Sequence, residues 1–169
     1  MKPETIIQKL ASNRFVFQNL LTHTSEELST FRSNPEAWCL LEVVCHLLDE
    51  EVEDFRERVN HVLTTPKTPL RSISPDKWPK ERAYLQKDFG ATLTTFLVER
   101  QNSIEWLLSL KEPDWQQTVD HPEVGPRSAK KFLVNWLAHD YHHIRQINRI
   151  HHAFLRFSSN DDLTYAGRW

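Results

Sequence analysis

The chain has 169 residues, 39% hydrophobic and 26% charged, which is typical of a single globular domain spanning residues 1–169 and excludes a disordered protein. Its formal net charge of −2 gives no basic field for nucleic acid, and no apolar run approaches the roughly 20 residues of a membrane span. Three glycines are too few for the many turns of an all-β fold, and without a secretory signal behind Met1 we expect a cytoplasmic protein.

The first segment predicts a helix from Pro3 to His23, because proline is well placed at a helix start. Its apolar residues recur near helical spacing and would face a core. They are Ile6, Ile7, Leu10, Phe17, Leu20 and Leu21. Residues 24–28 (TSEEL) then indicate a helix cap and a short turn.

A second helix is expected to start between Pro35 and Leu40 and to run to about Leu63. Its apolar face consists of Leu40, Val43, Val44, Leu47, Leu48, Phe55 and Val59. The charged residues of the same stretch are expected on a solvated face. They are Glu50, Glu51, Glu53, Asp54, Arg56, Glu57 and Arg58. Cys39 and Cys45 lie too far apart on one helix to pair, so we expect two buried free thiols.

Residues 64–79 contain four prolines and predict a connecting loop, long enough to fold over the end of a bundle and roof a pocket there. A third helix begins between Pro79 and Asp88 and ends near Leu110. Its apolar stripe consists of Leu93, Phe96, Leu97, Ile104, Leu107 and Leu108.

A second irregular loop is expected from Glu112 to Arg127. Ser128 then caps the last long helix, from Ala129 to about Leu155. The remaining tail, residues 157–169, is expected to be irregular, with Trp169 able to pack back on the body. Four long amphipathic helices joined by two long loops predict an all-α four-helix bundle.

Histidines in the last helix carry the strongest chemical signal. His139 and His143 are four residues apart, so a helix places both imidazoles on one face. They continue an inward-facing line that consists of Phe132, Trp136, His139, His143, Ile147 and Ile150. Buried imidazoles are costly unless they are hydrogen-bonded or bind a metal. The spacing therefore favours a metal site, with ordinary core or surface histidines as the alternative.

A third ligand is expected from the second helix, where His46 lies between apolar residues Val43 and Leu47. Three imidazoles leave one coordination position open, which is typical of catalytic rather than structural metal sites. Imidazole ligands suit a divalent ion such as zinc or nickel, with iron and copper as alternatives.

Two acidic residues near His46 are candidates for a supporting role. Glu50 lies one helical turn later and would act as a general base or orient the His46 ring. Asp49 competes for that role, and the alternative for both is a solvated helix face. His142, His151 and His152 are expected at the surface or at an edge of the bundle.

Two segments together resemble a known family. Residues 38–47 read WCLLEVVCHL and residues 139–147 read HDYHHIRQI, which is similar to the DinB/YfiT-like superfamily of metal-binding four-helix bundles. The resemblance implies that His46, His139 and His143 are the metal ligands. Cys39 replaces the usual Ser or Thr helix cap, and Ile144 precedes Arg145 and Gln146 where the family often has Arg-Gly-Gln.

The resemblance implies a metal-dependent enzyme acting on a small molecule. Related members are S-transferases for low-molecular-weight thiols such as bacillithiol or mycothiol, isomerases that use such thiols, or hydrolases. The other hypothesis is a non-catalytic bundle, either a metal-stabilised scaffold or a stress-response binding protein, expected to be a homodimer. A metal that is open to a solvent-reachable pocket would favour the enzyme.

Overall fold

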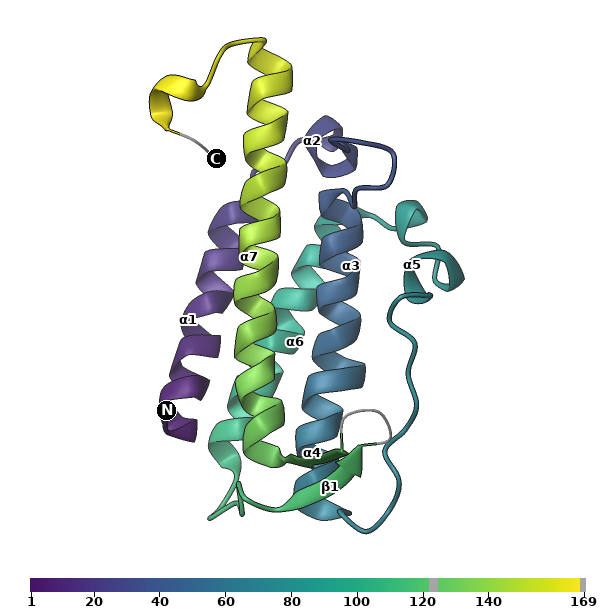
Figure 1. Ribbon diagram of the computed structural model, residues 1–169, viewed down its shortest axis with the longest axis vertical. Helices are drawn as coiled ribbons and strands as arrows, with labels where there is room; N and C mark the ends of the chain where they lie inside the picture. The colour runs from purple at the N-terminus through teal and green to yellow at the C-terminus, as the bar shows by residue number, and fades with distance from the viewer. Residues whose placement is uncertain (122–124, 168–169) are drawn as a thin grey trace.

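The computed structural model describes residues 1–121 and 125–167, so the expected packing of Trp169 lies outside the described residues (Figure 1). Four long rods form the bundle. They are α1 (Pro3–Leu21), the continuous rod α3 (Leu40–Glu50), π-helical η1 (Glu51–Arg56) and α4 (Glu57–Thr64), then α6 (Phe89–Ser109) and α7 (Ala129–Ser159). The short elements are α2 (Glu26–Thr30), α5 (Trp78–Glu81), η2 (Tyr84–Gln86), η3 (Thr164–Ala166), β1 (Thr118–His121) and β2 (Gly125–Ser128). The predicted all-α four-helix bundle is confirmed.

The direction in which each rod runs explains the long proline-rich connection between α4 and α6. In Figure 1, α1 and α7 run upward, whereas α3–α4 and α6 both run downward. Because α3 and α6 are parallel neighbours, the chain must return to the top of the bundle between them. Residues 65–88 make this return along the outside of the bundle, so the expectation that residues 64–79 fold over its end is wrong.

The apolar stripes meet in two core clusters, one in each half of the bundle. Members of one include Leu10, Val59 and Leu133, and members of the other include Phe17, Val44 and Phe96. The stripes predicted for the helices are buried with few exceptions, of which Leu108 is the clearest because its side chain is 68% exposed. The sequence positions that separate the two clusters carry buried polar side chains on every rod, and this polar layer contains the histidines.

The face of the second rod that was expected to be solvated is partly buried. Glu50, Glu51 and Arg58 are all buried, so the prediction is wrong for these three. Glu51 continues a four-residue spacing from Leu47 to Phe55 and therefore faces inward, where the apolar stripe would otherwise have continued.

The loop predicted from Glu112 to Arg127 contains an antiparallel hairpin in place of irregular structure. β1 pairs with β2, with Thr118 opposite Ser128, and Val119 buries its side chain in the core. Burial of that valine gives the hairpin a hydrophobic anchor that its short length alone would lack. Ser128 caps α7 as predicted, since its hydroxyl accepts a hydrogen bond from the Lys131 amide at 3.1 Å.

The start of α3 has Cys39 at the position where the family usually has a Ser or Thr cap. The Cys39 amide donates to the Glu42 carboxylate at 3.0 Å, and Arg32 holds the same carboxylate at 2.8 Å. The helix start is thus supported by Glu42, and both Cys39 and Cys45 are buried and free, as predicted. Within the described residues, no helix combines the length and the hydropathy that crossing a bilayer would require.

Candidate metal centre

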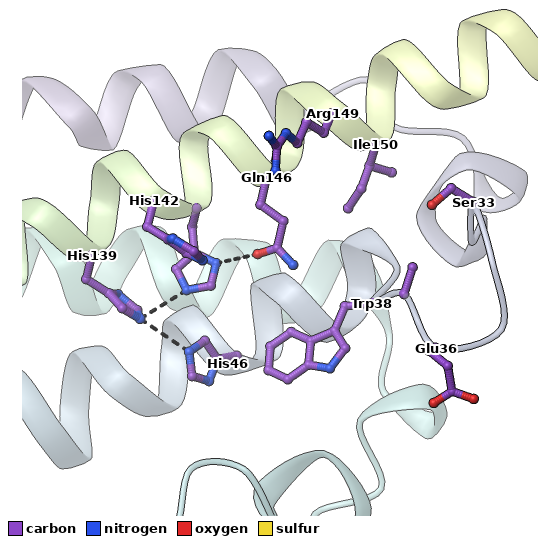
Figure 2. A pocket seen from close by; sticks show the side chains of 11 residues that line it. Ser33, Glu36, Trp38, His46, His139, His142, Gln146, Arg149 and Ile150 are labelled. Carbon is purple, nitrogen blue, oxygen red and sulfur yellow. Dashed lines mark hydrogen bonds between the residues drawn. The ribbon is translucent and has the colours of Figure 1, made fainter. Parts of the chain in front are cut away.

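Three histidines from two rods converge in the polar layer. His46 comes from α3 and His139 from α7 (Figure 2). His143 lies one turn after His139 on α7. The Nε2 atom of His139 lies 3.2 Å from that of His46 and 3.0 Å from that of His143. One ligand atom from each residue lies within 4.8 Å of the other two. The three residues selected from the sequence are therefore brought together.

Burial controls the protonation of the cluster. Burial, with a smaller contribution from repulsion between the neighbouring imidazoles, lowers the pKa of His46 to about 3 and that of His139 to about 2. Burial also lowers the pKa of His143 to about 4. All three rings are neutral at pH 7, which is the form of imidazole that ligates a metal.

The hydrogen-bonding capacity of these rings fits a metal ion. His143 donates from Nδ1 to Gln146 Oε1 at 2.7 Å, so its Nε2 atom presents a lone pair. His139 Nε2 makes two short contacts but carries at most one hydrogen. Only one of the contacts can then be a good hydrogen bond, and the other brings two lone pairs or two N–H groups together. A cation at the meeting point of the three Nε2 atoms would remove this conflict, and the residues therefore fit a divalent metal.

Glu50 lies where a carboxylate would orient His46. The Nδ1 atom of His46 is buried without a hydrogen-bond partner, and Glu50 Oε1 lies 4.0 Å away. Burial, together with the nearby Asp54 carboxylate, raises the pKa of Glu50. Metal-ligating histidines commonly direct their second nitrogen at such a carboxylate.

Asp49 is held by partners other than His46. It accepts a hydrogen bond from the Tyr84 hydroxyl at 2.5 Å and lies 2.9 Å from Arg82. These contacts turn its carboxylate away from His46, so Asp49 is no longer a competitor for the role of Glu50.

We expect Glu50→Gln to weaken metal binding by roughly 10- to 100-fold. This is the usual effect of losing a carboxylate that orients a metal ligand without binding the metal itself. The Asp49→Asn variant is the matched control and should retain wild-type affinity, because its carboxylate contacts Tyr84 and Arg82 instead. Competition titration against a chromogenic chelator measures both. Equal affinities for the two variants would show that Glu50 does not support the site.

A pocket of about 620 Å³ leads from solvent to the histidines. Its walls come from residues 33–38 and from α7, so the roof expected from residues 64–79 is supplied by a different segment. Figure 2 shows Trp38 beside His46, with the two ring centroids 5.1 Å apart. Residues that the sequence did not suggest as ligands or catalytic groups also line it, namely Ser33, Glu36, Ala37, Gln146, Arg149 and Ile150. Trp38 and Gln146 had a signal as parts of the two family motifs, and Ile150 had one as part of the inward-facing line of the last helix.

The other histidines lie near the edge of the site or far from it. His142 is exposed as predicted, although it lines the pocket and its ring centroid lies 5.0 Å from that of His143. His151 is half-buried at the edge of the bundle, with its Nε2 atom 3.0 Å from the Leu20 carbonyl oxygen. His152 is also half-buried, and it lines a separate pocket near the end of α7.

The fold and the cluster define a class of protein, four-helix bundles with an interior three-histidine cluster that opens into a pocket. The chain belongs to the DinB superfamily, whose family model matches residues 9–147. YfiT from Bacillus subtilis has the same fold, with a TM-score of 0.78 over 88% of this chain and 85% of that chain, at 17% sequence identity. YfiT is described as a probable metal-dependent hydrolase with an unusual four-helix bundle topology. No curated protein matches the sequence.

Proposed function

We propose that the chain is a metal-dependent enzyme that transfers a low-molecular-weight thiol to a small-molecule substrate. His46, His139 and His143 would hold one divalent ion, zinc or nickel in the first place and iron as the alternative. When bound, such an ion lowers the pKa of a thiol or water molecule that coordinates it and so supplies a nucleophile at neutral pH.

The observation that carries this proposal is that the cluster opens directly into the pocket. Structural metal sites usually have four protein ligands, whereas catalytic sites keep one position for water or substrate. In the part of the chain that the structure describes, no fourth His, Cys, Asp or Glu joins the three histidines. The pocket, at about 620 Å³, has room for a small molecule beside them.

Charges at the pocket rim favour a thiol that carries ionic groups. Arg149 on α7 and Glu36 on the facing segment are both exposed (Figure 2). Neither makes an ion pair within residues 1–121 and 125–167. A guanidinium and a carboxylate on opposite walls suit the carboxylate and the ammonium of a thiol derived from an amino acid.

Hydrolysis is the second candidate, because YfiT shares the fold and is described as a probable metal-dependent hydrolase. In that case the pocket would admit water to the histidine cluster, and Glu50 would accept a proton. The two reactions differ in the nucleophile, which is a thiol in the transfer and water in the hydrolysis. The histidine ligands would be the same in both.

Elemental analysis of the purified protein, followed by turnover assays with and without a chelator, tests the proposal. We expect about one divalent ion per chain and chelator-sensitive conjugation of a small thiol to an electrophile. Chelator-sensitive cleavage of esters without thiol conjugation would identify the hydrolase. Bound metal without turnover in either assay would favour the non-catalytic scaffold or stress-response binding protein.

Removal of the rim cation should affect substrate binding more than chemistry. We expect Arg149→Ala to raise KM for an anionic thiol roughly tenfold with little change in kcat, which corresponds to one charge-assisted hydrogen bond of about 1.5 kcal/mol. Arg145→Ala is the matched control, since Arg145 is an exposed arginine of the same helix that does not line the pocket. Equal effects of the two substitutions on KM would exclude a specific role for Arg149.

A further inference from the structure

A buried ionic network crosses the bundle in the polar layer. Arg100 of α6 is 1% exposed, and its two carboxylate partners are equally inaccessible, Glu51 at 1% and Asp140 at 0%. Two guanidinium nitrogens donate to the two oxygens of Asp140, both at 2.7 Å. The same guanidinium reaches Glu51 Oε2 at 2.9 Å through Nε and lies 2.8 Å from it through Nη2.

Two further hydrogen bonds extend the network to all four rods. Asn13 of α1 donates to Asp140 Oδ2 at 3.0 Å, and the Trp136 indole of α7 donates to Glu51 Oε2 at 3.0 Å. Arg100 therefore connects α6 to η1 and to α7, while Asn13 connects α1 to α7. The network thus forms a polar link between the rod that carries His46 and the helix that carries His139.

Both carboxylates are sequence neighbours of the candidate metal centre. Asp140 follows His139, and successive helical residues point about 100° apart. Anchoring Asp140 toward α1 and α6 therefore sets the rotation of α7 that directs His139 toward α3. Glu51 follows Glu50 on the rod of His46, so its contact with Trp136 sets that rod against α7.

Stability alone is a poor reason for such a network. Taking ions out of water costs free energy that their attraction barely returns, and apolar residues of similar volume are often as stabilising. The network also places one cation against two carboxylates, and Glu51 Oε1 is left without a hydrogen-bond partner. The hydrogen bonds of the network, by contrast, are directional and so fix one position of the helices relative to one another. Apolar packing fixes that position less strictly.

We propose that Arg100, Glu51 and Asp140 are positioning residues that hold α3 and α7 in the rotation at which the three histidines converge. This inference rests on the metal site of the proposed function and is independent of which reaction occurs there. It assigns a role to three buried ionic side chains that lie outside the pocket.

Cobalt titration of Asp140→Asn and Glu51→Gln tests the proposal, because both substitutions preserve side-chain volume. We expect each to raise the dissociation constant for cobalt by about tenfold or more. Residues that position metal ligands without binding the metal commonly have effects of this size. The visible cobalt bands should also shift, since they report ligand geometry. Glu99→Gln is the matched control, because it removes an ion pair between η1 and α6 at 2.7 Å, on side chains about a quarter exposed.

The outcomes separate this inference from the proposed function. Wild-type affinity and wild-type cobalt bands in a variant that unfolds cooperatively would overturn it. If one variant fails to fold, the other gives the answer, because Glu51 and Asp140 lie at opposite ends of the network. Metal binding without turnover would contradict the proposed function alone.

If the wild-type protein binds no metal, the proposed function fails and a crystal structure of the metal-free Asp140→Asn variant decides the inference. We then expect the Nε2 atoms of His46 and His139 to lie farther apart than their 3.2 Å in the native chain. An unchanged separation would overturn the positioning role.

Discussion

Replacing His139 with alanine is expected to abolish stoichiometric metal binding. His139 is the central member of the cluster, since its Nε2 atom makes both short contacts with the other two rings. Two imidazoles would remain, and a pair holds a divalent ion far less tightly than three. The dissociation constant should rise by more than the roughly 100-fold that marks the loss of an outer residue. Elemental analysis after dialysis and a competition titration both measure the effect.

His142→Ala is the control for this experiment. His142 is the adjacent histidine of the same helix and lines the pocket, yet it does not belong to the three-residue cluster. We expect its substitution to leave metal content at the wild-type level. If His142→Ala loses metal and His139→Ala retains it, the metal lies on the other face of α7 and the proposed centre is wrong.

Replacing Arg100 with methionine is expected to reduce the free energy of unfolding by about 3–5 kcal/mol, the usual consequence of leaving a buried charge without its partner. Methionine fills much of the same volume, so the loss arises from Glu51 and Asp140, which would face each other across the core without a cation. Urea unfolding of the metal-free protein, followed by circular dichroism, measures the change without any contribution from metal binding.

Arg56→Met provides the matched control for Arg100. Arg56 pairs with Glu99 at 2.7 Å, but the two side chains are 23% and 26% exposed. A pair that water reaches contributes only about 0–1 kcal/mol, so this variant should stay close to wild-type stability. Comparable losses in the two variants would show that burial of the Arg100 network has no special energetic consequence.

The sequence predicted the helices well because the apolar residues repeat at helical spacing on each rod. It also predicted the histidine pair, since His139 and His143 belong to one helix and their relation is local. The prediction of His46 required one further inference. His46 lies between the apolar residues Val43 and Leu47, so it should face the same interior as the histidine pair. That step succeeded because an inward-facing position on one rod must meet inward-facing positions on the others.

The charged residues of the core were missed although their spacing contained a signal. Glu51, Arg100 and Asp140 each occupy a position that continues the apolar stripe of its helix, as Glu51 does between Leu47 and Phe55. Charged residues are rarely buried unless paired, so Glu51 was expected on a solvated face, and neither Arg100 nor Asp140 was assigned to the core. The three are buried together because their charges partner one another across helices.

The sequence by itself determined the helices, most of their inward faces and the three histidines of the candidate metal centre, because these follow from periodicity within single segments. Only the tertiary structure decided the parallel order of α3 and α6, the outside path of residues 65–88 and the pocket wall of residues 33–38. Each of these depends on which segments, distant in sequence, pack against one another. Such contacts arise from the summed burial and pairing of many side chains, which no local pattern encodes.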